Sequence, residues 1–258
     1  MKRLEISNLN YSYSSKFALK DINLSFDNSV TAVIGPNGAG KSTMIKCIAN
    51  IYKCSGDVYY MNRKINRNNK SFYSSNVSYL PQASQSDATI TVFEAVLLGL
   101  MNTLALRVSP KQMEAVDSML EAFELRHLAQ RRICELSGGQ LQMALIAQAV
   151  IKRPGILLLD EPLNNLDIHR QFALMSMVSS LSKRRDMITV IIMHDINLAA
   201  RYADNIVIMN NGKLYSQGMP RKVITREMLR DIYKIESNIH IRNEGYPVIE
   251  FIDIAANF

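Results

Sequence analysis

The segment from residue 35 to residue 43 has the residue types and spacing of a phosphate-binding loop. It fits G-x-x-x-x-G-K-[ST], and its three glycines let the backbone wrap tightly enough for successive N–H groups to point at phosphate oxygens. We expect Lys41 to reach the β- and γ-phosphates of ATP, and the Ser42 hydroxyl to reach Mg²⁺. The predicted loop consists of Gly35, Pro36, Asn37, Gly38, Ala39, Gly40, Lys41, Ser42 and Thr43.

The residues on either side of this loop support a phosphate site. The apolar, β-rich run at 30–34 predicts the buried strand that must precede such a loop, and Met44, Ile45 and Ile48 predict an apolar helix after it. That helix would turn the positive end of its dipole toward a bound phosphate. A chance glycine-rich surface loop would have neither flank.

An acidic pair follows a second apolar run. Residues 156–159 are Ile-Leu-Leu-Leu, which predicts a buried strand, and Asp160 and Glu161 come directly after it. Asp160 suits an aspartate that holds Mg²⁺ through water, and Glu161 can polarise the water that attacks the γ-phosphorus. A solvated acidic turn is the alternative, and the four buried-type residues before the pair argue against it.

These motifs, in this order, resemble the ABC-type ATPases, the nucleotide-binding subunits of ATP-binding cassette transporters, along almost the whole chain. The resemblance implies that Tyr13 stacks on adenine, that Gln82 senses Mg²⁺ and the permease, and that His194 contacts the γ-phosphate. Residues 165–167 resemble the family's D-loop, which implies that Asp167 is one of the nucleotide-binding residues. Each match would be weak alone, so the assignment depends on their joint order. The implied catalytic residues are Lys41, Gln82, Glu161 and His194, and the implied metal ligands are Ser42, Gln82 and Asp160.

The run at 136–140, Leu-Ser-Gly-Gly-Gln, resembles the family's signature and opens a predicted helix, whose N-terminal N–H groups attract anions. The resemblance implies two copies head to tail, with each ATP between the loop of one copy and Ser137, Gly138, Gly139 and Gln140 of the other. An ordinary helix capped by Ser137 is compatible with this role. Leu141 and Met143 depart from the family pattern, because basic residues often follow the signature.

The sequence predicts an α/β fold, a P-loop ABC ATPase core. We expect a mostly parallel sheet, an N-terminal antiparallel β part and an inserted α-helical subdomain. In this interpretation residues 1–258 form a single ABC ATPase domain, with a core subdomain (1–83 and 156–215), a helical signature subdomain (84–155) and a C-terminal tail (216–258). The helical prediction depends on apolar residues at three-and-four spacing, such as Val92, Ala95 and Val96, then Met113 and Val116.

Composition limits the possible locations and partners. The chain has 258 residues, of which 48% are hydrophobic, but no run of the roughly 18 apolar residues that a membrane span needs. The three cysteines lack metal-binding spacing, so we expect reduced, buried thiols. The net charge of +7 favours solubility and proximity to a membrane, because the basic clusters lack the interleaved aromatic residues of a nucleic-acid site. We therefore expect no nucleic-acid partner and a peripheral location at the cytoplasmic face of the cell membrane.

Less specific stretches, at 194–204, 218–220 and 232–236, are similar to ATPases of importers for iron-siderophores, haem and cobalamin. Residues 163–167 are similar to the iron-chelate branch, which implies import of an iron-siderophore or a related iron chelate. This similarity implies a homodimer of ATPase subunits, two membrane-spanning permease subunits and, indirectly, a substrate-binding protein. An importer of another nutrient, such as zinc or manganese, stays open, as do a soluble ABC ATPase acting on nucleic acid or the ribosome and a non-hydrolysing binding module. The sequence does not identify the cargo.

Overall fold

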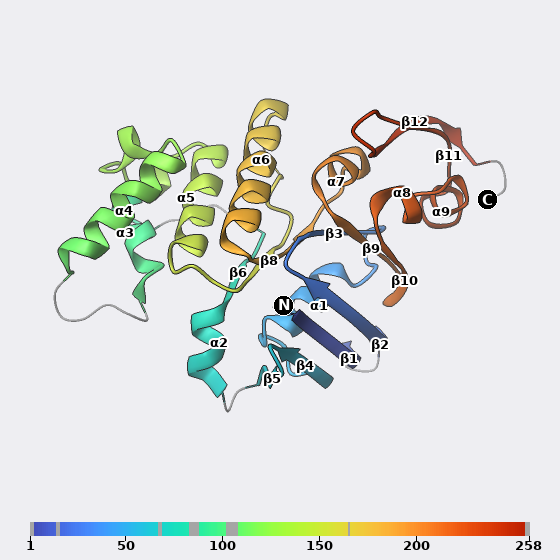
Figure 1. Cartoon of the computed structure of the whole chain (residues 1–258), viewed down its shortest axis with the longest axis horizontal. Coiled ribbons are helices and arrows are strands. Elements are labelled where there is room, and N and C mark those ends of the chain that lie inside the picture. The colour runs from blue at the N-terminus through green and yellow to red at the C-terminus, as the bar shows by residue number, and fades with distance from the viewer. Residues whose placement is uncertain are drawn as a thin grey trace.

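The computed structural model describes residues 3–13, 16–66, 69–82, 88–101, 108–164 and 166–255. Its core is a six-stranded sheet in which all neighbouring strands are parallel except β10 and β9. In spatial order its strands are β10 (Lys213–Gly218), β9 (Asn205–Asn210), β3 (Val30–Ile34), β8 (Ile188–Ile192), β7 (Ile156–Leu159) and β6 (Val77–Leu80). The predicted mostly parallel sheet is confirmed (Figure 1).

The central strands carry apolar runs because both faces of the sheet are covered. Every residue of β3, β7 and β8 is buried. One face packs on α1 (Lys41–Ile48), and the other on α6 (Ile168–Arg185) and α7 (Ile196–Tyr202). Figure 1 shows α6 and α7 on one side of this sheet and a smaller sheet on the other. The carboxyl ends of parallel strands meet at one edge, and the predicted chemical residues follow those ends.

The smaller sheet is antiparallel and confirms the N-terminal β part. Its order is β2 (Lys16–Asp27), β1 (Arg3–Tyr13), β4 (Ser55–Tyr60) and β5 (Arg63–Lys64), and α2 (Lys70–Asn76) follows it. Ser55 and Gly56 begin β4. Gly56 has φ +90°, and a Cβ there would lie 2.3 Å from the Asn8 carbonyl oxygen, so the glycine marks a close backbone approach.

Helices fill the block between β6 and β7. They are α3 (Val92–Leu98), α4 (Pro110–Ala122) and α5 (Gly138–Ile151), with single 3₁₀ turns at Arg126–Leu128 and Ile133–Glu135. The predicted apolar face is buried at Val92, Val96 and Val116, whereas Met113 is 48% exposed, contrary to its place in the pattern. The predicted boundary at residues 83 and 84 lies outside the described residues, and the subdomain limits stay predictions. Within the described ranges, no helix combines the length and apolar character needed to cross a bilayer.

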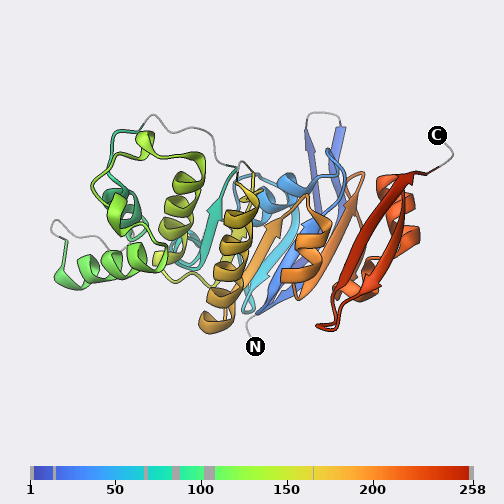
Figure 2. The same cartoon turned by 90° about the horizontal axis from the view of Figure 1, so that it is seen from above.

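The C-terminal segment has more structure than the sequence predicted. It contains α8 (Pro220–Val223), α9 (Arg226–Met228), a π-helical turn at Leu229–Tyr233, and a hairpin of β11 (Ile235–Ile241) and β12 (Pro247–Ile254). The Asn197 side chain fastens this hairpin to α7, because its Nδ2 donates to the Ile249 carbonyl (3.0 Å) and its Oδ1 accepts from the Ile249 N–H (2.7 Å). In Figure 2 the hairpin lies at the end of the molecule opposite the helical block.

The three cysteines are free thiols, as expected, but only one is buried. Cys47 lies inside the core, Cys54 is partly exposed and Cys134 is exposed. The expectation of buried thiols is therefore confirmed for Cys47, met only in part by Cys54 and wrong for Cys134, which precedes the signature on an exposed turn.

Candidate functional site

The predicted phosphate loop forms one wall of a cavity of about 450 Å³. Gly38 has φ +77°, and a Cβ added there would meet no atom within 4 Å, so this glycine faces open space. Helix α1 begins at Lys41, so its N-terminal N–H groups lie next to the cavity. The lining residues are Tyr13, Ala18, Asn37, Gly38, Ala39, Gly40, Lys41, Ser42, Thr43 and Glu161.

The ammonium group of Lys41 is held inside the loop. Lys41 is only 5% exposed, and its Nζ donates to the carbonyl oxygens of Gly35 (2.8 Å) and Pro36 (2.9 Å). Burial lowers the pKa of Lys41, and the negative charges of Glu161 and Asp160 oppose that shift. Carbonyl partners do not neutralise the ammonium charge. The loop therefore presents a buried cation, which suits binding of an anionic phosphate.

Asp160, at the end of β7, is 3% exposed and holds two hydroxyl groups. Its Oδ1 accepts from Ser42 Oγ (2.8 Å) and its Oδ2 accepts from the Tyr79 hydroxyl (3.3 Å). Carboxylate and hydroxyl oxygens are the hard ligands that Mg²⁺ takes, so Asp160 and Ser42 fit the predicted metal site. Gln82, the third predicted ligand, follows β6 on the same edge of the sheet and is exposed.

Tyr79 was not predicted to belong to the site. It lies three residues before Gln82 in β6, and the sequence gives no sign that its hydroxyl reaches a strand end 81 positions away. Burial raises the pKa of Tyr79, and the Asp160 carboxylate raises it further, so the hydroxyl keeps its proton and acts as a donor at neutral pH. Tyr79 therefore orients the Asp160 carboxylate through its Oδ2 atom, while Oδ1 faces Ser42.

We expect Tyr79→Phe to weaken divalent-metal binding by about tenfold, because partners behind a metal ligand typically have effects of that size. The measurement is Mn²⁺ affinity in the presence of ATP, by electron paramagnetic resonance. Tyr73→Phe is the matched control, since its hydroxyl donates instead to the Ala49 carbonyl at the end of α1. Equal Mn²⁺ affinity in the two variants would contradict the role of Tyr79.

Glu161 lies at a sharp turn directly after β7. Its φ of +51° is unusual for a residue with a side chain, and such conformations persist only where the surroundings hold them. Two groups hold the carboxylate: Asn164 Nδ2 donates to Oε2 (2.7 Å), and His194 Nε2 lies 2.7 Å from Oε1. His194 follows β8, so adjacent strands bring this pair together at the cavity. Asn164 was missed because its contact depends on the turn, not on a motif.

Tyr13 lies at the rim of the cavity and is 47% exposed. Its hydroxyl is 3.3 Å from Thr43 Oγ1. Tyr11 and Tyr52 stack on each other with ring centroids 4.9 Å apart, and Tyr13 meets both edge-on. Tyr13 thus brings an aromatic ring to the rim of the loop cavity, and its stacking on adenine stays a prediction.

The signature residues lie elsewhere. Ser137 caps α5 in a capping box, in which its Oγ accepts from Gln140 N–H (3.4 Å) and Gln140 Oε1 accepts from Ser137 N–H (3.0 Å). The described residues that line the loop cavity include none of the four signature residues, Ser137, Gly138, Gly139 and Gln140. Asp167 caps α6, whereas Asn165 lies outside the described residues. One chain therefore brings together the loop, Asp160, Glu161 and His194, but not the signature.

The chain is similar to known proteins over nearly its full length. Residues 19–164 match the family model described as ABC transporter. The chain is 36% identical over 249 residues to an uncharacterized ABC transporter ATP-binding protein from Methanocaldococcus jannaschii, covering 95% of this chain and 96% of that protein. It is 34% identical to a petrobactin import ATP-binding protein from Bacillus anthracis (92% and 89% covered) and 33% identical to a hemin import ATP-binding protein from Shewanella denitrificans (95% and 99%).

Solved structures agree. The chain is similar to an ATP-binding cassette of an ABC transporter in its ADP conformation, with a TM-score of 0.80, 27% identity, and 90% and 98% of the two chains covered. It is also similar to a bacterial ABC transporter cassette solved as a dimer, with a TM-score of 0.75, 27% identity, and 84% and 98% covered.

Proposed function

The chain belongs to the ABC transporter family, and we propose that it is the ATP-hydrolysing subunit of an importer for an iron-siderophore or related iron chelate. The observation that carries the ATPase role is the loop cavity itself, which Lys41, Ser42 and Glu161 line and to which Asp160 is joined by its hydrogen bond with Ser42. The cargo proposal is supported by relatives named for import of petrobactin and hemin. The hemin relative makes haem the second candidate cargo, ahead of cobalamin, zinc or manganese.

In the proposed cycle two copies close on two ATP molecules, and the signature of each copy completes the site of the other. Lys41 and His194 contact the γ-phosphate, and Glu161 accepts a proton from the attacking water, held in place by Asn164. Ser42 and Asp160 would hold Mg²⁺, which would supply positive charge against the phosphate groups when bound. Closure is favoured because contacts to the γ-phosphate from both copies exist together only in the closed pair.

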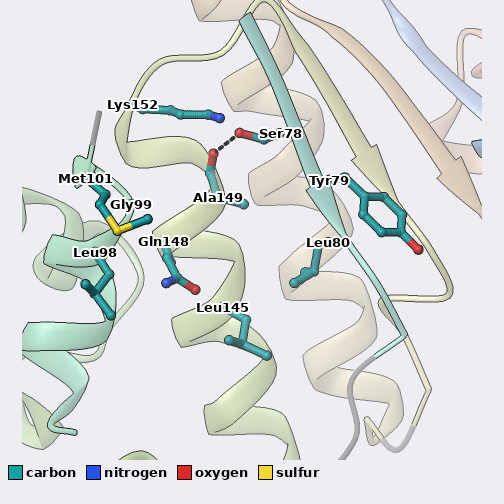
Figure 3. A pocket seen from close by; sticks show the side chains of 10 residues that line it. All are labelled: Ser78, Tyr79, Leu80, Leu98, Gly99, Met101, Leu145, Gln148, Ala149 and Lys152. Carbon is teal, nitrogen blue, oxygen red and sulfur yellow. Dashed lines mark hydrogen bonds between the residues drawn. The ribbon is translucent and has the colours of Figure 1, made fainter. Parts of the chain in front are cut away.

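We propose that the permease binds at a second cavity of about 220 Å³, where β6, α3 and α5 meet (Figure 3). This cavity is called the groove below. Leu98 and Met101 expose apolar side chains there, and Ser78 Oγ donates to the Ala149 carbonyl (2.6 Å), which ties β6 to α5. Figure 3 shows the Tyr79 ring on the side of β6 away from α5. Because Tyr79 also reaches Asp160, β6 connects this groove to the metal-binding edge.

The experiment that tests the importer proposal is purification of the tagged chain from detergent-solubilised native membranes, followed by identification of its partners. The proposal expects a multi-helix permease, and it expects the ATPase activity of the purified complex to rise with a binding protein loaded with a ferric chelate. If only a binding protein loaded with a different nutrient stimulated the ATPase activity, that nutrient would be assigned as the cargo instead. Soluble or nucleic-acid partners alone would contradict the importer role.

We expect Met101→Asp to reduce permease recovery at least about tenfold, because the contact would bury a carboxylate without a partner. Met101 is 66% exposed, so the substitution should not unfold the subunit. Met113→Asp is the matched control, since Met113 is 48% exposed on α4, outside the groove. Equal permease recovery with both variants would place the permease contact elsewhere.

A further inference from the structure

Arg170, which no motif in the sequence singled out, lies on the signature. It belongs to the first turn of α6, and its Nη1 donates to Ser137 Oγ (3.2 Å). A Cβ added to Gly139 would lie 2.3 Å from Arg170 Nη1 and 3.0 Å from its Cδ, so the arginine packs directly against the glycine backbone. One side chain from a distant helix therefore touches two of the signature residues.

Asp167 sets the position of this arginine. As the cap of α6, its Oδ1 accepts from the Arg170 backbone N–H (2.8 Å), and its Oδ2 lies 3.4 Å from Arg170 Nε. The Arg170 side chain is nevertheless 43% exposed, and its Nη2 has no hydrogen-bond acceptor among the described residues. Asp167 and Ser137 thus hold two of the three guanidinium nitrogens in place.

Arg170 lies at a helix end that has no basic side chain of its own. Helix α5 contains no lysine or arginine, and Leu141 and Met143 occupy the positions after the signature where a positive charge could have stood. The N-terminus of α5 attracts anions through its N–H groups, and a guanidinium beside it offers paired donors that match a phosphate. Arg170, paired with the Asp167 carboxylate, therefore places a guanidinium at a helix end that has no basic residue of its own.

We propose that Arg170 is a further γ-phosphate ligand, which completes the signature half-site for the ATP bound to the loop of a second copy. This inference rests on the proposed ATP-dependent dimer. Because Arg170 would act only across the dimer, its loss should weaken dimer formation and leave ATP binding to a single chain unchanged. If Arg170 only stabilised α6, its loss would not weaken dimer formation selectively, and lysine would not differ from glutamine at this position.

The experiment compares variants of the full chain in a Glu161→Gln background, which accumulates the ATP-bound state. Sedimentation velocity measures dimer formation against ATP concentration, and calorimetry measures ATP binding to the monomer. We expect Arg170→Gln to raise the ATP concentration for half-dimerisation about tenfold or more, and Arg170→Lys to have a smaller effect, because lysine keeps the charge but not the paired donors. Arg126→Gln is the control, since Arg126 is exposed and pairs with Glu121 (3.4 Å) on the helical block.

Three outcomes overturn the proposal. Dimerisation of Arg170→Gln at the same ATP concentration as the parent would exclude a phosphate contact. Equal losses in Arg170→Gln and Arg170→Lys, together with a lowered Tm, would identify a structural role in α6. Failure of the Glu161→Gln parent itself to dimerise with ATP would instead remove the proposed dimer, so the two failures are distinguishable.

Discussion

Glu161→Gln should bind ATP as the parent does and hydrolyse it at least about a hundredfold more slowly, the effect typical of losing a positioned base. The amide keeps the shape of the side chain and its oxygen can still accept from Asn164 Nδ2, but it cannot accept the proton of the attacking water. Because reopening of the proposed dimer depends on hydrolysis, the variant should also accumulate as an ATP-bound dimer. Phosphate release and sedimentation measure the two effects separately.

Glu114→Gln is the matched control for this prediction, since Glu114 is an exposed carboxylate on α4, away from the loop cavity. It should hydrolyse ATP at the parental rate. Parental turnover in Glu161→Gln would remove Glu161 from the proposed role, and the acid–base function would then have to belong to another group at the same strand edge.

The sequence predicted the parts of the site that depend on local pattern. The glycine loop, the apolar strands and the acidic pair are each readable within about ten residues, because backbone conformation and burial impose their residue types. Parallel strands then bring their carboxyl ends to one edge, which explains why Asp160 and His194 lie near the loop although they are far apart in the chain. Topology thus turns several local signals into one site.

Contacts between side chains that are far apart in the chain could not be predicted from the sequence. Neither the bond from Tyr79 to Asp160 nor that from Arg170 to Ser137 has a spacing rule, since each depends on how two packed elements face one another. The β11–β12 hairpin was missed for the same reason, because its bond to Asn197 and its packing on α7 are tertiary. Met113 shows the opposite error: it fits the helical period but falls on the exposed side of α4.

The separation of the two phosphate-binding elements has a functional consequence. The loop with its buried cation and the capped N-terminus of α5 both suit anions, yet the signature residues are not among the described residues lining the loop cavity. A second copy would join the two elements, so ATP would act as part of the interface and its hydrolysis would weaken the dimer. Substitutions can therefore separate ATP binding, dimer closure and ATP hydrolysis. Substitution of Lys41 tests ATP binding alone.

Lys41→Ala should raise the Kd for ATP by about 10- to 100-fold, because a hydrogen bond to a charged group contributes roughly 1.5–3 kcal/mol. The lysine is buried within the loop, so no neighbouring side chain can take its place without moving. Calorimetry with ATP under non-hydrolysing conditions measures the effect, and Tm confirms that the loop still folds. Lys183→Ala, at the exposed end of α6, removes one positive charge far from the loop and should bind ATP as the parent does. Unchanged ATP affinity in Lys41→Ala would contradict phosphate binding by the loop, whereas weakened binding with a preserved fold would assign the affinity to this buried ammonium.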